Sequence, residues 1–268
     1  MSRVDWGRLG LGGYLALLFF FLVAPLLIVA VVSFNPEAVV RFPPRGFSLH
    51  WFRAVIESAT LVQAIANSLR LGALATAISI LVAVPAAVAL GRYDVPGKHV
   101  VEALLLSPLS LPMIVLGIAL LFLYSRLGLG LSFGGLLAAH VVITIPYILR
   151  CVLAVYRGLD PSLEDSARVL GATPWRAFRR VTWPLLRPGI VAGSIFSFLI
   201  SFDNVPVSIF LTTPPTTTLP VAILSQIVYS FEPTIAAVST LEMVAVVVGL
   251  WLVEQFYGLR QFTAFGAQ

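Results

Sequence analysis

Residues 9–32 read LGLGGYLALLFFFLVAPLLIVAVV, a run without a charged side chain. A helix needs about 20 apolar residues to cross a bilayer, because each residue adds about 1.5 Å to a path of about 30 Å. The apolar core of a cleavable signal peptide is shorter, about 7–15 residues, and no small-x-small cleavage pattern precedes the polar turn after this run. We therefore interpret residues 9–32 as a retained transmembrane span.

The composition of the whole chain agrees with a membrane protein. Of its 268 residues, 59% are hydrophobic and 11% are charged, which is too little charge for the surface of a soluble protein of this size. Five further apolar segments are long enough to span a bilayer: 64–90, 101–124, 136–155, 189–210 and 234–256. The sequence predicts an all-α membrane protein of about six transmembrane helices, with residues 1–268 forming one domain.

The distribution of basic residues predicts the orientation. The chain has 17 Lys and Arg against 12 Asp and Glu, an excess that would suggest nucleic-acid binding in a soluble protein. Most of these basic residues fall on the side of the two termini, and cytoplasmic loops carry such an excess. We expect a multi-pass protein of a bacterial-type cytoplasmic membrane with both termini inside and no nucleic-acid partner. The single cysteine, Cys151, excludes an intrachain disulfide.

The segment 156–188, between the fourth and fifth predicted spans, carries its own helix signals. Asp160-Pro161 and Thr173-Pro174 each read as an N-cap followed by proline at the first helical position. Gly171 is placed to end the first helix in a left-handed conformation, and Pro184 is expected to stop the second. These signals predict two short cytoplasmic helices joined at a glycine corner.

Isolated helices this short are marginal in water, so other groups must hold them in place. The second helix can rest on its own spans. Glu164, Asp165 and Ser166 on the first helix are expected to point elsewhere, into a groove on a soluble partner. The alternative is an amphipathic loop that lies on anionic lipid, which accounts for the arginines but not for the two capped helices.

This segment resembles the EAA loop of ABC importer permeases. The residues that carry the resemblance are Glu164, Asp165, Ser166, Ala167, Gly171, Ala172, Pro184, Pro188 and Gly189. Asp165 and Ser166 stand where the family usually has Glu and Ala, and Trp183 replaces a leucine. In that family the loop contains the coupling helix that docks on a separate ATPase, so the resemblance implies a type I ABC importer permease fold and the same docking role here.

A wider resemblance to the spermidine/putrescine branch of this family covers nearly the whole chain. It rests on 48–52 (SLHWF), 67–69 (NSL) and 201–204 (SFDN). It implies a polyamine-like cargo or another organic cation, although Asn204 stands where a second acid is common. Other members carry other small organic solutes or complexed iron. The implied partners are a second, homologous permease subunit, an extracytoplasmic solute-binding protein, and two ATPase subunits that hold ATP and Mg.

Polar residues inside the predicted spans are candidates for the solute pathway. They are Tyr124, Ser201, Asp203, Asn204 and Glu242. A carboxylate at the bilayer centre costs about 2.5–3.5 kcal/mol on insertion scales, so Asp203 and Glu242 should face protein or water. Either they contact the solute, or they form hydrogen bonds between helices. The sequence leaves both interpretations open.

The sequence gives little support for a catalytic function. Residues 130–134 (GLSFG) match the nucleophile-elbow pattern, but they fall in a glycine-rich turn between two predicted spans. The three histidines have no metal-ligand spacing, and no phosphate-binding G-x-x-x-x-G-K-[ST] motif occurs. We therefore expect no catalytic or metal-binding residues, with ATP hydrolysed by another polypeptide. A secondary transporter that works without an ATPase is the remaining alternative, although no two related halves are visible.

Overall fold

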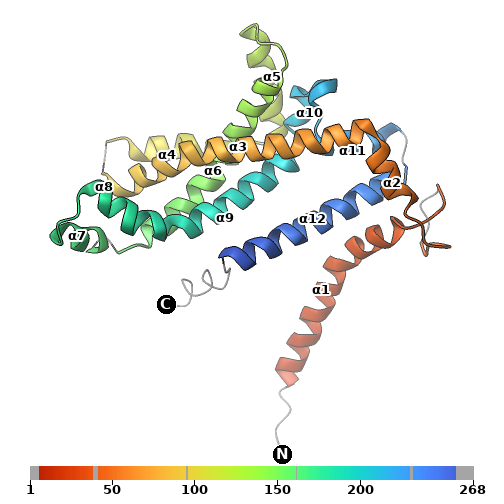
Figure 1. The fold of residues 1–268 in the computed structure, drawn as a ribbon, viewed down its shortest axis with the longest axis horizontal. Helices are drawn as coiled ribbons and strands as arrows, with labels where there is room; N and C mark the ends of the chain where they lie inside the picture. Colours follow the sequence, from red (N-terminus) through yellow and green to blue (C-terminus); the bar gives the residue numbers. More distant parts are fainter. Residues whose placement is uncertain (1–5, 39–41, 95, 161, 230–231, 258–268) are drawn as a thin grey trace, which may run out of the picture. The chain divides into compact units, whose positions relative to one another are not determined.

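The computed structural model describes residues 6–38, 42–94, 96–160, 162–229 and 232–257, and Figure 1 shows that helices dominate these ranges. The chain divides into two compact units. The first unit contains Met1–Val62 and Ile223–Leu259, and the second contains Gln63–Ala222. The candidate coupling segment and most of the candidate pathway residues belong to the second unit.

The first unit is built on two long helices, α1 (Trp6–Val32) and α12 (Thr234–Tyr257), and contains the short helix α2 (His50–Glu57). Both α1 and α2 pack on α12. The Trp51 indole N–H donates to the Asn35 carbonyl at 2.8 Å, which holds α2 against the turn after α1. Large apolar side chains of α1, such as Phe19 and Phe21, are exposed, as expected for a helix that faces lipid.

The second unit contains the remaining helices. Its long helices are α3 (Ala59–Arg92), which begins in the first unit, α6 (Phe133–Arg157) and α9 (Trp183–Phe202). Its shorter helices are α4 (Lys98–Leu106), α5 (Met113–Arg126), α7 (Ser162–Val169), α8 (Pro174–Ala177) and α10 (Ser208–Leu211). Single turns occupy Ser107–Ser110, Phe178–Thr182 and Pro214–Thr216, and α11 (Leu219–Tyr229) crosses into the first unit.

Close packing of α6 against α9 organises the second unit, and Figure 1 shows the two helices side by side. The contact depends on two glycines of α9. A Cβ at Gly189 would lie 2.8 Å from the Cys151 carbonyl oxygen, and one at Gly193 would lie 2.8 Å from the Ile148 Cα. Because these neighbours are backbone atoms, only glycine permits this approach.

Buried residues of three helices form the core at the α7 end of the second unit. α3 contributes Ala83 and Ala87, α6 contributes Ile148 and Val152, and α9 contributes Leu186. Polar side chains between these helices are paired with one another. The Ser79 and Thr144 hydroxyls lie 2.8 Å apart, and those of Thr76 and Ser197 lie 3.2 Å apart. Such pairing satisfies the polar groups that hydrocarbon would leave without partners.

Five helices in the described residues are long and apolar enough to cross a membrane, and a bent pair would make six. Two predicted spans differ from the structure. The predicted third span, 101–124, is not one helix, because the chain bends by 106° between Ser110 and Met113, at Pro112. The predicted fifth span, 189–210, is also wrong as a single helix. α9 ends at Phe202, since the Pro206 ring would clash with the carbonyl four residues earlier.

Pro184 does not stop the second helix of the coupling segment, contrary to the prediction. The helix runs from Pro174 to Phe202, with a π-helical turn at Phe178–Thr182. In this turn the Trp183 N–H donates to the Phe178 carbonyl, five residues earlier. A proline has no N–H for the normal helical bond and crowds the carbonyl of residue i−4. The wider turn directly before Pro184 relieves that crowding, so the helix continues.

We predict that Gly193→Ala destabilises the second unit. The new methyl group would force α6 and α9 apart, and overpacking of this kind costs about 1–3 kcal/mol. The unfolding midpoint of the purified protein in detergent should fall. Gly249→Ala in α12 is the matched control, because nothing lies within 4 Å of its added Cβ. A Gly193→Ala protein as stable as the control would contradict the packing argument.

Candidate functional site

The predicted caps of the coupling segment are confirmed. The Ser162 N–H donates to Asp160 Oδ1 at 2.9 Å, and the Ser162 hydrogen bonds hold the pKa of Asp160 below its ordinary value. Gly171 has φ +85°, the left-handed conformation expected of it. The Thr173 hydroxyl accepts from the Arg176 N–H at 3.4 Å. Pro161 lies outside the described residues. The segment 162–177 is thus a pair of capped helices around a glycine corner.

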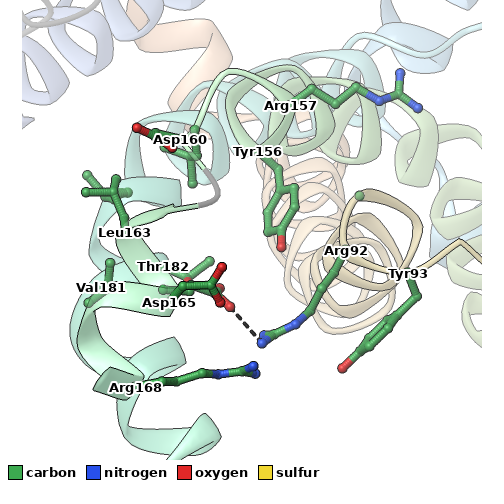
Figure 2. Close-up of a pocket in the computed structure, with 14 residues that line it drawn as sticks. Arg92, Tyr93, Tyr156, Arg157, Asp160, Leu163, Asp165, Arg168, Val181 and Thr182 are labelled. Atoms are coloured by element: carbon green, nitrogen blue, oxygen red, sulfur yellow. Dashed lines mark hydrogen bonds and ion pairs between the residues drawn. The ribbon is translucent and has the colours of Figure 1, made fainter. Parts of the chain in front are cut away.

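Glu164 does not point toward a partner, and this prediction was wrong. An Arg92 guanidinium nitrogen at the end of α3 lies 2.7 Å from one Glu164 carboxylate oxygen. The Thr182 hydroxyl, in the π-helical turn, donates to the other oxygen. Side chains of the ion pair are 18% and 17% exposed. The dashed line in Figure 2 marks the ion pair, with Arg92 extending toward α7.

A cavity of about 530 Å³ lies between α7 and the ends of α3 and α6. The Arg92–Glu164 pair lines it together with Tyr93, Tyr156, Arg157, Asp165 and Arg168, and these last five side chains are labelled in Figure 2. Basic and acidic side chains are both present in its wall. The cavity separates α7 from the two long helices beside it.

The opposite side of α7 is open. Ser166 is exposed there, as predicted; Asp165 is also exposed, but it lines the cavity. Val169 and Leu170 are 87% and 88% exposed, although they are large apolar residues at the end of a polar helix. The exposed surface formed by Ser166, Val169 and Leu170, here called the α7 outer face, suits a protein partner better than water.

The other residues of the resemblance lie elsewhere. Ala167 and Ala172 are half-buried, and the Ala172 N–H closes the glycine corner on the Ala167 carbonyl at 3.0 Å. Pro184, Pro188 and Gly189 all belong to α9 rather than to a loop. Gly189 packs on α6, so its role is helix packing.

The helical structure is interrupted between α9 and α10. Three of the candidate pathway residues, Ser201, Asp203 and Asn204, lie at this helix break. Asp203 is exposed at the end of α9. Asn204 is 5% exposed; its Oδ1 accepts from the Val207 N–H at 2.9 Å, and its amide donates to the Met113 sulfur at 3.6 Å. Asn204 therefore shapes the break, whereas the Asp203 carboxylate is accessible.

His140 of α6 holds both sides of this break, a role that the sequence analysis missed. The ring is fully buried, with Nδ1 2.8 Å from the Ser201 hydroxyl of α9 and Nε2 3.1 Å from the Ser208 hydroxyl of α10. A histidine inside an apolar span must find polar partners, and that requirement was the available signal. Ser201 is thus part of an interhelical hydrogen-bond network.

The remaining two candidate pathway residues, Tyr124 and Glu242, lie away from this helix break. The Tyr124 hydroxyl donates to the Gly135 carbonyl at 2.8 Å, which joins α5 to the start of α6. Glu242 is half-buried on α12, in the first unit. Among the four pathway candidates in the second unit, Asp203 is the exposed one, and Tyr124, Ser201 and Asn204 form internal hydrogen bonds.

Residues 67–69, which contributed to the resemblance, support the chain after α10. The Asn67 amide donates to the Pro215 and Thr217 carbonyls at 3.0 and 2.9 Å, and the Ser68 hydroxyl accepts from the Leu219 N–H at 2.8 Å. These bonds attach residues 213–219 to α3. The polar residues of this span therefore hold a turn in place.

Long apolar helices with a capped, projecting helix between two of them define an integral membrane transport subunit. The chain belongs to the family described as the binding-protein-dependent transport system inner membrane component, whose model matches residues 83–258. It is accordingly a multi-pass inner-membrane permease subunit of an ABC importer, and ATP is hydrolysed on a separate subunit.

Relatives and solved structures agree with this assignment. The chain is 33% identical over 240 residues to the spermidine/putrescine transport system permease protein PotC of Escherichia coli K12, covering 89% of this chain and 90% of PotC. It is 31% identical over 235 residues to the putrescine transport system permease protein PotI of the same organism, covering 85% and 83%. A bacterial ABC transporter that imports alginate has a similar fold, with TM-score 0.72, 16% identity, and coverage of 96% and 99%.

We predict that His140→Leu lowers the stability of the break between α9 and α10. Two buried hydroxyls, Ser201 and Ser208, would lose their partner, at a cost of about 1–3 kcal/mol for each unsatisfied group. The unfolding midpoint in detergent measures the effect. Removing all three polar groups, as His140→Leu with Ser201→Ala and Ser208→Ala, should recover part of the loss. A His140→Leu protein as stable as the wild type would show that the network contributes nothing.

Proposed function

We propose that this chain forms half of the translocation channel of an importer for polyamines or similar organic cations. It pairs with a second, homologous permease subunit, and two ATPase subunits bind its cytoplasmic face. An extracytoplasmic binding protein delivers the solute. ATP-driven closure of the ATPases moves α7 and so switches the helices between outward-open and inward-open states.

The observation that carries the coupling proposal is the α7 outer face. Val169, the last residue of α7, and Leu170, directly after it, are two large apolar side chains that are almost fully exposed. Burial of such side chains contributes about 1.5–3 kcal/mol each, which favours a protein partner over water. Ser166 adds a hydroxyl group on the same face. A small projecting helix with this surface suits a groove on a soluble ATPase subunit.

This proposal places α7 and both termini on the cytoplasmic side. Arg157, Arg168, Arg176, Arg179 and Arg180 all lie in or next to α7 and α8, as the positive-inside rule requires of a cytoplasmic segment. Arg3 and Arg260, which support the same orientation, lie outside the described residues.

The proposed cargo rests on two observations. The relatives named above are polyamine permeases, and Asp203 supplies an exposed carboxylate at a helix break in a predicted span. An intramembrane acid that faces a water-filled path attracts a cation. A different small organic solute or complexed iron is the second candidate. The amide of Asn204 favours it, because a second acid is absent at the position after Asp203.

Coupling is tested with Leu170→Glu. The side chain is exposed, so the fold should tolerate the change, while a charge in the docking groove should reduce co-purification with the ATPase subunits at least tenfold. Leu129→Glu, in the exposed turn after α5, is the matched control and should retain the complex. If Leu170→Glu binds ATPase as well as the control does, α7 is not the docking element.

Cargo is tested by uptake of labelled putrescine and spermidine into proteoliposomes that contain the complete transporter. Asp203→Asn should reduce uptake about tenfold, because the carboxylate that attracts the cation is lost. Glu57→Gln, an exposed acid in α2, should leave uptake unchanged. Unchanged uptake with Asp203→Asn would refute the cation pathway, and ligand profiling of the associated binding protein would then identify the solute.

A further inference from the structure

The cavity beside α7 lies where two spans meet water. α3 and α6 are long and apolar enough to cross a membrane, and their last residues, Arg92 and Arg157, both line the cavity. Arginine side chains near the ends of transmembrane helices extend to the interface between lipid and water. The cavity is therefore at the level of the lipid headgroups.

Most charged groups in the cavity wall already have partners within the protein. Arg92 lies 2.7 Å from Glu164, and Arg157 lies 2.8 Å from Glu102 of α4. Asp160 accepts a hydrogen bond from a backbone N–H at the start of α7. These groups are thus occupied by the fold itself.

Two exposed charged groups of the wall remain, one of each sign. Within the described residues, neither Asp165 nor Arg168 of α7 forms an ion pair. Figure 2 shows the Arg168 side chain extending from α7 into the cavity. Tyr93 adds a hydroxyl group to the wall, and the Arg92 guanidinium carbon lies 5.7 Å from the centre of its ring. The cavity thus offers a ligand one cation, one anion and a hydroxyl donor.

Other parts of the cavity wall are apolar. Leu163, Val181 and Leu185 line it together with Tyr156. Its volume of about 530 Å³ is within the range of about 300–1,000 Å³ that is typical of small-molecule sites. Apolar walls with a few placed polar groups suit a ligand that is partly apolar and carries charges of both signs.

We propose that this cavity binds the headgroup of a phospholipid that carries both a phosphate and a primary ammonium group, as phosphatidylethanolamine does. Arg168 and the Tyr93 hydroxyl bind the phosphate, and Asp165 binds the ammonium group. The apolar wall covers the glycerol part of the lipid. Such a site is independent of ATPase docking, because it depends on the position of the cavity at the membrane boundary.

The charges of the cavity select among phospholipids. Purely basic pockets between transmembrane helices bind anionic headgroups. Here Asp165 repels a headgroup that has a phosphate but no cation, such as that of phosphatidylglycerol. A choline headgroup has a cation but no N–H, so it cannot donate a hydrogen bond to the carboxylate. Phosphatidylethanolamine forms charge-assisted hydrogen bonds with both the guanidinium and the carboxylate.

The surroundings favour a lipid over a soluble zwitterion. α4 is joined to the cavity wall by the Glu102–Arg157 pair, and none of its residues is buried. Val100 and Leu104 of α4 are each 71% exposed. Large apolar side chains that remain exposed beside membrane spans contact acyl chains. Lipid therefore reaches the helix that adjoins the cavity.

The test uses the complete transporter, purified in detergent with its ATPase subunits and freed of endogenous lipid. Native mass spectrometry measures the binding of phosphatidylethanolamine, phosphatidylcholine and phosphatidylglycerol with identical acyl chains. Phosphatidylethanolamine should bind about tenfold more tightly than either of the others, the effect of one hydrogen bond to a charged group. Equal binding of the three lipids would overturn the inference.

Two variants assign the binding to this cavity. Arg168→Gln should weaken the binding of phosphatidylethanolamine about tenfold, because the phosphate loses its guanidinium partner. Asp165→Asn should reduce the preference over phosphatidylglycerol to about threefold or less, because the ammonium loses its partner and the repulsion of the anionic lipid is removed. Both side chains are exposed, so the fold should tolerate the changes.

Arg126→Gln, at the exposed end of α5, is the matched control and should bind phosphatidylethanolamine as the wild type does. If Arg168→Gln and Asp165→Asn both keep the wild-type preference, the bound lipid lies elsewhere and the inference fails.

Further measurements distinguish the lipid from other occupants of the cavity. Glycerophosphoethanolamine, which has the same headgroup without acyl chains, should compete at least about tenfold more weakly than the lipid. Competition as strong as that of the lipid would overturn the lipid assignment in favour of a soluble zwitterion. Phosphatidylethanolamine bound by the isolated chain but not by the complete transporter would show that an ATPase subunit fills the cavity, which also overturns it. ATPase docking itself is tested separately by Leu170→Glu.

Discussion

The contact between α6 and α9 is the constraint on which the second unit depends. Gly189 and Gly193 let the two backbones approach so closely that any side chain there would meet main-chain atoms. In lipid the hydrophobic effect does little to drive helices together, so close van der Waals contact and interhelical hydrogen bonds must do so. Once α9 is fixed on α6, the π-helical turn before it and the break after it are fixed as well.

The contact between α6 and α9 also explains why buried polar residues gather at the break between α9 and α10. α6 carries His140 to the far end of the packed pair, and there its two ring nitrogens meet hydroxyls on both sides of the break. Without water, the groups freed by a helix break must be satisfied by other helices. Asn204 and Met113 complete this arrangement. The rigid surroundings leave the Asp203 carboxylate as the accessible polar group of the break, which a solute can approach.

Local signals in the sequence predicted local structure well. Gly171 and Thr173 act by backbone conformation and capping, which depend on a few neighbouring residues, and both behave as expected. The direction of Glu164 could not be predicted, because Arg92 is distant in sequence and meets it through the fold. The prediction that Pro184 ends its helix was also wrong. The π-helical turn before it lets the helix continue through a proline, which a regular helix would not permit. The helix break at Asp203 was missed because its neighbours are as apolar as those of an intact span, although Pro206 was a signal for it.

The geometry also separates the paired and the exposed residues of α7. Side chains along a helix are rotated by about 100° per residue, so Glu164 stays paired with Arg92 while Ser166 and Val169 lie on the exposed surface. Glu164 is half-buried and paired, while Asp165 is exposed. A helix that receives a force on one face must be attached on another, or it would turn in place. The Arg92–Glu164 pair attaches one face of this eight-residue helix, and the exposed Ser166 and Val169 lie on another.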